Sequence, residues 1–376
     1  MPSPKMTIVM TTIALPRVLE SYAENAARHG RLAHVEALVI GDRKTPAESA
    51  ACLEDIRSRW GFRAEYIDVA AQQAWLARFP GLEEIIPYNS DNRRNAGFLM
   101  ALDRGCDVLL SIDDDNYCTE DDFYAGHAVA GSRVSGPVVR STNGWFNICT
   151  MMENDAGMLF YPRGFPAARR NGSPGIARET REVFIAANAG LWIEDPDIDA
   201  VTRLYREFKT TRLSAEPVIL GPEANSPINT QNTAVCRQAV PAYYYVVMGD
   251  DLGGAKIDRY GDIWSGYFLK KCADHLGHFV MVGHPVARHI RNRHDLFVDL
   301  RQELYGMMLT DPLVEMLGSL TLAGGDYAAA YLDLSRKLEQ AVEASQHPYI
   351  TPEVRAYFRK ICSNMRVWVD ACRDLR

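Results

Sequence analysis

The sequence predicts an α/β protein, with a mostly parallel sheet flanked by helices and a helical C-terminal extension. Two observations favour this fold class. Short β-rich runs alternate with helical patterns over the first 118 residues, and strands separated by helices pair in parallel through right-handed crossovers. After about residue 300 the apolar side chains recur at helical spacing instead. We therefore expect a sheet domain at residues 1–300 and a helical extension at residues 301–376.

The individual elements follow from local start and stop signals. Pro16 fits the first turn of one helix, and a capping box of Thr45 and Glu48 opens a second helix, which Gly61 ends. A further helix is expected at residues 95–104. The expected strands of the parallel sheet cover residues 7–13, 35–40, 62–69 and 107–112. The middle of the chain is less regular, with short β-like pieces expected at residues 190–193 and 279–282.

The composition limits the partners and the location. A formal charge of −7 and a pI near 5.8 argue against a nucleic-acid backbone as the main partner. No apolar run approaches the roughly 20 residues that span a bilayer, and no secretory apolar region is recognisable. The eight cysteines form no C-x-x-C pair, which argues against a zinc or redox motif. We expect a cytoplasmic protein, in which the apolar faces of the last helices could join two subunits.

The most informative motif is the acidic run Asp113-Asp114-Asp115, which follows the apolar residues 108–110. Three adjacent carboxylates repel one another, and the end of a strand does not require them. A hard divalent cation such as Mn²⁺ or Mg²⁺ would compensate them, since it binds carboxylate oxygens and completes its shell with water and substrate phosphates. The run therefore indicates an enzyme that handles a nucleotide diphosphate, and the alternative is a solvated acidic loop.

Three further side chains could surround a ligand at this edge of the sheet, where parallel sheets bind their ligands. Asp42 ends a strand, where it could hydrogen-bond a base or ribose or simply hold a turn. Arg94 precedes a helix, where its fork of N–H groups could pair with a pyrophosphate or lie in solvent. His289 follows a strand in a basic cluster and could join Asp113 and Asp115 as a metal ligand, although a lone histidine is more often structural.

Taken in order, these motifs resemble those of glycosyltransferases with the GT-A fold. More narrowly, they resemble the reversibly glycosylated polypeptides, whose members include UDP-arabinopyranose mutases. The resemblance covers roughly residues 7–300. Its anchors are Thr11-Thr12-Ile13, Arg94 with Gly97-Phe98, the run from Ser111 to Asp115, Gly190-Leu191-Trp192, residues 259–266 and Asp274-His275-Leu276-Gly277. The acidic run alone is moderately specific, and the ordered set is considerably more so.

The resemblance implies a nucleotide-sugar donor, a UDP-sugar first of all, bound with Mn²⁺ or Mg²⁺. It also implies an arginine that becomes glycosylated, here Arg163 in Arg163-Gly164-Phe165-Pro166, and a carboxylate beside the reacting sugar, here Asp262 as a general base. The metal ligands would be Asp113, Asp115 and His289. The donor contacts would be Thr11, Asp42, Arg94, Asp113, Asp114 and Trp264, the last as a platform for the sugar ring or, equally, as a residue of the core.

We therefore predict a metal-dependent glycosyltransferase that moves a sugar from a nucleotide-sugar donor to a hydroxyl group of a small molecule or a protein. One alternative is a mutase that converts the sugar between pyranose and furanose forms on its nucleotide, with self-glycosylation of an arginine. An alternative of another class is a non-catalytic nucleotide-sugar-binding module. A sugar nucleotidyltransferase is disfavoured, because no Gly-rich phosphate loop follows the first strand. The family pattern is lost at residues 288–293 and in the helical tail, which leaves the acceptor open.

Overall fold

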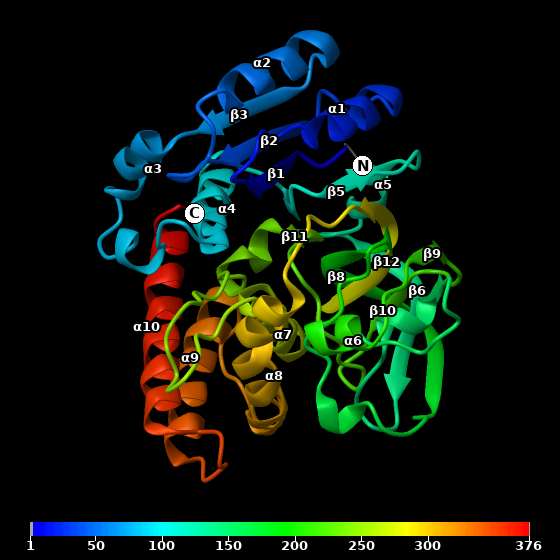
Figure 1. Ribbon diagram of the computed structural model, residues 1–376, viewed down its shortest axis with the longest axis vertical. Coiled ribbons are helices and arrows are strands. Elements are labelled where there is room, and N and C mark those ends of the chain that lie inside the picture. The colour runs from blue at the N-terminus through cyan, green and yellow to red at the C-terminus, as the bar shows by residue number, and fades with distance from the viewer. Residues whose placement is uncertain (1–2, 376) are drawn as a thin grey trace.

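The N-terminal part of the protein is a parallel sheet, as the sequence predicts. The computed structural model describes residues 3–375 (Figure 1). Four strands pair in parallel in the order β3-β2-β1-β4. Their bounds are β1 Met6–Thr11, β2 Val35–Ile40, β3 Arg63–Ile67 and β4 Val108–Ile112. Nearly every residue of β1, β2 and β4 is buried, as in a strand that is covered on both faces.

Helices cover both faces of these strands, with α1 and α2 on one side and α4 on the other (Figure 1). The expected capping box is wrong, because the Thr45 hydroxyl donates to the carbonyl of Thr12 at 2.6 Å instead of capping the helix. One helix, α3, lacks an amphipathic stripe and was not expected from the sequence. The bounds are α1 Leu19–Arg28, α2 Ser49–Trp60, α3 Val69–Leu76 and α4 Arg94–Asp103.

The middle of the chain extends the same sheet with mixed pairing. β11 pairs antiparallel with β4 on one side and with β8 on the other, and the order continues through β6, β10 and β12 to β5. The pieces expected at residues 190–193 and 279–282 are parts of the longer strands β8 and β12, which pair in parallel. The α/β fold class is therefore confirmed, with antiparallel pairing added in the middle of the chain. The bounds are β5 Asn116–Cys118, β6 Arg133–Ser141, β7 Met152–Asn154, β8 Ile176–Glu194, β9 Thr210–Leu213, β10 Val218–Leu220, β11 Asn232–Cys236 and β12 Phe279–His289.

Helices dominate the end of the chain, as expected. The boundary expected after residue 300 falls inside α8, and apolar residues of α9 and α10 belong to the same continuous core as the sheet. Across that core, the ring of Phe358 in α10 stacks on Trp264 in α7 with the centroids 5.5 Å apart. Within residues 3–375, no helix combines the length and the apolar character needed to cross a membrane. The bounds are α5 Phe123–His127, α6 Ala200–Tyr205, α7 Gly261–His275, α8 Leu296–Ser319, α9 Tyr327–Ala344 and α10 Pro352–Asp374.

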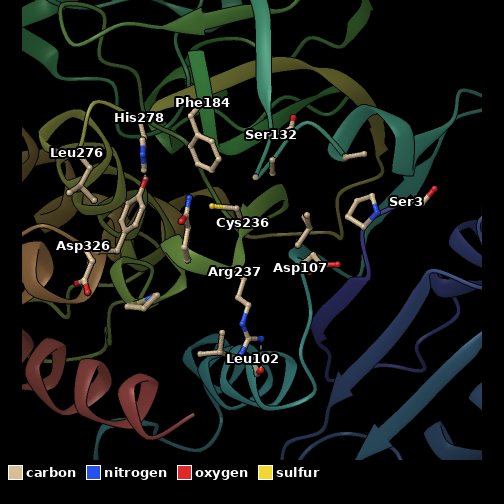
Figure 2. A pocket seen from close by; sticks show the side chains of 18 of the residues that line it. Ser3, Leu102, Asp107, Ser132, Phe184, Cys236, Arg237, Leu276, His278 and Asp326 are labelled. Atoms are coloured by element: carbon tan, nitrogen blue, oxygen red, sulfur yellow. Dashed lines mark hydrogen bonds between the residues drawn. The ribbon is translucent and has the colours of Figure 1, made fainter. Parts of the chain in front are cut away.

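A large cavity of about 1200 Å³ lies at the amino ends of β1 and β4. Figure 2 shows its lining, with Asp107 and Arg237 on one side and Phe184 and His278 on the other. β4 is five residues long, so this cavity lies roughly 15–20 Å from the opposite end of the strand. Because ligands of parallel sheets gather at the carboxyl ends, the candidate site is at the other edge, beside the acidic run.

Candidate functional site

The carboxyl end of β4 places the acidic run among segments from distant parts of the sequence. β11 pairs with β4 up to Ile112, so the residues that precede β11 reach the start of the run. After Asp115 the chain enters β5, which pairs antiparallel with the end of β12, where His289 pairs with Asn116. The run is therefore enclosed by the approach to β11 on one side and by the end of β12 on the other.

Arg94 at the start of α4 neutralises the first carboxylate of the run. Its Nη2 donates to Asp113 Oδ1 at 2.6 Å and to the Thr11 hydroxyl at 3.4 Å, and its Nη1 donates to the Thr230 hydroxyl at 2.9 Å. Arg94 is buried, whereas the Asp113 side chain keeps 39% of its surface exposed. Partial burial raises the pKa of Asp113, the ion pair with Arg94 opposes this rise, and the charge of Asp115 adds to it. Arg94 is therefore not exposed to solvent at the start of the helix, which was the alternative to a role in pairing with a pyrophosphate.

Two more of the predicted donor contacts lie at this edge, where they hold other parts of the protein. The Thr12 hydroxyl donates to Asp114 Oδ2 at 2.5 Å. Asp42 accepts hydrogen bonds from the backbone N–H groups of Arg43 at 2.7 Å and Ser90 at 3.2 Å. Asp42 therefore fixes the turn after β2, and Asp114 is tied to the loop after β1.

Asp115 and His289, two of the three predicted metal ligands, are in contact. Nε2 of His289 lies 3.3 Å from Asp115 Oδ2, and its Nδ1 lies 2.5 Å from the backbone carbonyl of Asp195. Burial by itself lowers the pKa of His289, but the hydrogen bond with Asp115 outweighs it and raises the pKa above its usual value. The third predicted ligand, Asp113, is turned to Arg94. Within the described residues no three histidine, cysteine or acidic side chains converge on one point, so the predicted set of three ligands is not assembled.

The chemistry of this pair nevertheless fits a divalent cation. A carbonyl oxygen only accepts, so Nδ1 of His289 carries the hydrogen that it shares with Asp195. In a neutral imidazole, Nε2 then presents a lone pair to the carboxylate of Asp115. Two acceptors at 3.3 Å require a proton or a cation between them. An imidazole whose other nitrogen is fixed by a backbone carbonyl is the usual arrangement of a metal-binding histidine.

Arg163 and Asp262, the two predicted catalytic residues, are in direct contact. Nη2 and Nη1 of Arg163 donate to Asp262 at 2.8 and 3.1 Å, while its Nε and Nη2 donate to Asp197 at 2.8 and 3.1 Å. Nη1 also donates to the carbonyl of Arg259, so all five N–H groups of the guanidinium are used. Arg163 is only 8% exposed, and it is neither the solvated arginine nor the unpartnered loop residue that its sequence setting suggests. We call these three side chains, Arg163, Asp197 and Asp262, the arginine clamp.

The arginine clamp and the acidic run share one electrostatic environment. Burial acts to lower the pKa of Arg163, but Asp197 and Asp262 outweigh it and raise the pKa well above its usual value. The charge of Asp262 contributes to the raised pKa of Asp113, and the charge of Asp197 contributes to that of His289. The charges of the arginine clamp therefore act on both Asp113 and His289.

Two outcomes differ from the sequence prediction. Trp264 is fully buried, stacked on Phe358 and near Tyr357, so the structure supports its alternative role as a core residue and contradicts the sugar platform. Conversely, Asp197 was not predicted at all. Its signal in the sequence is that it follows the carboxyl end of β8, which ends at Glu194, in the same way as the acidic run follows β4.

Two solved structures show a loose similarity to this chain. Glucosyl-3-phosphoglycerate synthase from Mycobacterium tuberculosis, solved with Mn²⁺ and UDP-glucose, is 11% identical over 82% of this chain and 78% of its own, with a TM-score of 0.39. A mannosyltransferase from Pyrobaculum calidifontis, solved with GDP-mannose and Mn²⁺, is 9% identical over 99% of this chain and 86% of its own, with a TM-score of 0.42. The similarity to both structures is loose.

Relatives in sequence identify the group more narrowly. A probable UDP-arabinopyranose mutase 4 from Arabidopsis thaliana is 28% identical over 294 residues, which are 77% of this chain and 73% of the relative. UDP-arabinopyranose mutase 1 of the same plant is 28% identical over 271 residues, 71% of this chain and 69% of the relative. The model of the reversibly glycosylated polypeptide family matches residues 53–376. The chain belongs to this family, which confirms the resemblance stated above.

Proposed function

We propose that the protein binds a UDP-sugar and interconverts the pyranose and furanose forms of the sugar, because relatives that it resembles are named UDP-arabinopyranose mutases. The observation that supports this proposal most directly is the position of Arg163, which lies buried between the two carboxylates of Asp197 and Asp262. The proposal takes the mutase alternative in place of transfer to a separate acceptor. A mutase needs no acceptor site, and an arginine inside the site can hold the sugar instead.

The proposal includes a covalent step on the guanidine of Arg163, in which Asp262 serves as the base because the raised pKa of Arg163 opposes spontaneous loss of its proton. The bond between C1 of the sugar and the phosphate oxygen breaks, its electron pair leaves with UDP, and an Nη of Arg163 forms a bond to C1. The guanidinium loses one proton in this step, and the carboxylate of Asp262, 2.8 Å from Nη2, accepts it. Asp197 keeps its hydrogen bond to Nε at 2.8 Å and so holds the modified side chain in place.

The change of ring size is then an isomerisation of the attached pentose. The bond between C1 and the pyranose ring oxygen breaks, the hydroxyl oxygen on C4 closes onto C1, and the hydroxyl proton moves to the released oxygen. Attack by UDP on C1 breaks the bond to Arg163, and the proton on Asp262 returns to the guanidine. No atom is gained or lost over the cycle, as an isomerisation requires.

Asp115 and His289 would hold a divalent cation, Mn²⁺ or Mg²⁺, with Asp113 nearby. When bound, such an ion supplies Lewis-acid neutralisation of the departing diphosphate. Arg94, which now pairs with Asp113 at 2.6 Å, adds a fixed positive charge beside the same group.

The test is incubation of the purified protein with UDP-arabinopyranose and Mn²⁺ without an acceptor, followed by analysis of the nucleotides and of the intact protein mass. We expect a ring-isomerised nucleotide and a protein carrying one pentosyl group on Arg163. Arg163→Lys keeps the charge but loses the planar fork, and we expect a loss of turnover of roughly 100-fold from misplacement alone. Arg212→Lys is the matched control, because Arg212 forms an ion pair with Glu153 at the surface.

Other outcomes would contradict the proposal in different ways. Isomerised nucleotide with an unmodified protein would remove the covalent step. Transfer to an added hydroxyl compound without isomerisation would restore the glycosyltransferase prediction. Tight donor binding without any reaction would favour the binding module.

A further inference from the structure

A chain of amide side chains, two of them buried and that of Asn229 half-buried, connects the arginine clamp with the acidic run. On the clamp side, Nδ2 of Asn229 donates to Asp197 Oδ2 at 2.7 Å and to Oε1 of Gln231, also at 2.7 Å. On the other side, Nε2 of Gln231 donates to Oδ1 of Asn116 at 3.1 Å, and Nδ2 of Asn116 donates to Asp115 Oδ1 at 3.0 Å. We call Asn229, Gln231 and Asn116 the amide relay, and its ends are the two carboxylates of Asp197 and Asp115.

The direction of every hydrogen bond in the amide relay is fixed. The indole N–H of Trp192 can only donate, and it donates to Oε1 of Gln231 at 3.2 Å. Nε2 of Gln231 must therefore be the group that faces Asn116, and Nδ2 of Asn116 must face Asp115. The backbone N–H of Gln231 donates to Oδ1 of Asn229 at 3.2 Å, which turns Nδ2 of Asn229 toward Asp197. The amide relay thus donates hydrogen bonds to a carboxylate at each end.

Burial makes these directions costly to change. Asn116 is fully buried and Gln231 is 4% exposed, and a buried polar group that loses its partner costs the full desolvation penalty. If the carboxylate of Asp115 turns to a ligand, Asn116 loses an acceptor, and the hydrogen bonds of Gln231 and Asn229 must adjust with it. The same argument runs from Asp197 in the opposite direction.

We propose that Asn229, Gln231 and Asn116 are positioning residues that couple the carboxylate of Asp115 to the carboxylate of Asp197. This coupling would align Asp115, which would bind the cation beside the diphosphate, with Asp197, which holds Arg163. The proposal rests on the proposed function for its purpose, but the coupling itself is a property of the protein without ligand.

The first test therefore uses the protein alone. The indole N–H signal of Trp192, assigned by Trp192→Phe, is followed by ¹H–¹⁵N NMR in Asp115→Asn and in Asp197→Asn, two variants that keep the side-chain shape and remove one charge at opposite ends. We expect the Trp192 signal to move in both variants and to stay in place in Gln346→Glu, a control at an exposed glutamine. A signal that moves for neither variant, or for only one, would overturn the coupling.

The second test measures the coupling on a ligand, by titrating Mn²⁺ with UDP into four proteins: wild type, Asp197→Asn, Gln231→Glu and the double variant. The Gln231→Glu substitution keeps an acceptor for Trp192 and Asn229 but removes the donor to Asn116. We expect Asp197→Asn to change the Kd about threefold to tenfold, in the range of coupling between contacting residues, and to have no effect once Gln231 is replaced. Equal effects of Asp197→Asn in both backgrounds would overturn the coupling. Absence of Mn²⁺–UDP binding in the wild type would instead refute the proposed function, and the NMR result would still decide on the amide relay.

Discussion

Replacing Arg163 with methionine should destabilise the protein strongly, because the arginine clamp contains one cation and two carboxylates. The side chains of Arg163 and Asp262 are each 9% exposed and that of Asp197 is 12% exposed, so little solvent screening weakens these ion pairs. Removing one partner of a buried ion pair costs about 3–5 kcal/mol. The second carboxylate does not double this cost, because one of the two can take up a proton. We therefore expect Arg163→Met to lower the free energy of unfolding by about 3–5 kcal/mol at pH 7.

The pH dependence of this loss follows from the pKa of Asp197. Burial acts to raise that pKa, but the ion pair with Arg163 outweighs it and lowers the pKa below its usual value. A carboxylate whose pKa is lowered by folding stabilises the folded protein at pH values above the pKa that the same carboxylate has in the unfolded chain. This contribution is lost as the pH falls through the pKa that the carboxylate has in the folded protein. In Arg163→Met the same carboxylate lacks its cation and takes up a proton at a higher pH. The difference in stability between the two proteins should therefore narrow as the pH falls from 7 toward 4.

The assay is equilibrium unfolding in urea, followed by circular dichroism, at several pH values. The matched control is Arg212→Met, which removes an arginine whose side chain is 67% exposed and ion-paired with Glu153 at 2.6 Å. We expect little measurable change for this control, because exposed ion pairs contribute little to stability. A loss for Arg163→Met no larger than that of the control, or one that does not vary with pH, would show that the arginine clamp is not the buried ion-pair network described here.

Three further predictions concern other parts of the molecule. The affinity for Mn²⁺ should increase as the pH rises from about 5 to 8. Asp115 raises the pKa of His289 above the usual histidine value, and the proton on His289 must be lost before its nitrogen can bind the cation. Calorimetry would check this, and a flat profile would contradict it. Trp264→Ala should cost about 3–5 kcal/mol of stability but leave the Kd for UDP-sugar unchanged while the variant is folded; a weaker Kd would restore the sugar platform. Gly97→Ala should cost roughly 1–3 kcal/mol, because its Cβ would lie 2.4 Å from Cγ1 of Val9, and a thermal melt equal to that of the wild type would contradict this.

The sequence was informative where one strand could be recognised from its own residues. The buried runs of β1, β2 and β4 are short, apolar and followed by polar residues, so both the sheet and the edge that carries the acidic run could be predicted. The long β8 could not, because its first seven residues are exposed and four of them are charged, and only its last part has the apolar pattern of a buried strand.

The contacts between the site residues could not be predicted from the sequence, for a different reason. Arg94 is 19 residues from Asp113 and 136 residues from Thr230, and no periodic pattern connects side chains over such separations. Arg163 shows the same difficulty, since its loop contains no carboxylate and its partners lie 34 and 99 residues away. Sequence alone could name Arg163 and Asp262 separately by family resemblance, but it could not show that they touch.

The insertion of β11 between β4 and β8 has a consequence for the order in which the residues of the site become available during synthesis. Asp113 and Arg94 emerge close together from the ribosome, but Gln231 follows its partner Asn116 by 115 residues, and His289 comes later still. Until β11 has been made, β4 has an open edge, and open strand edges favour association with other chains. A nascent chain therefore carries the three aspartates before it has the histidine, so the divalent cation proposed for Asp115 and His289 could bind to both side chains only after three quarters of the polypeptide has been translated.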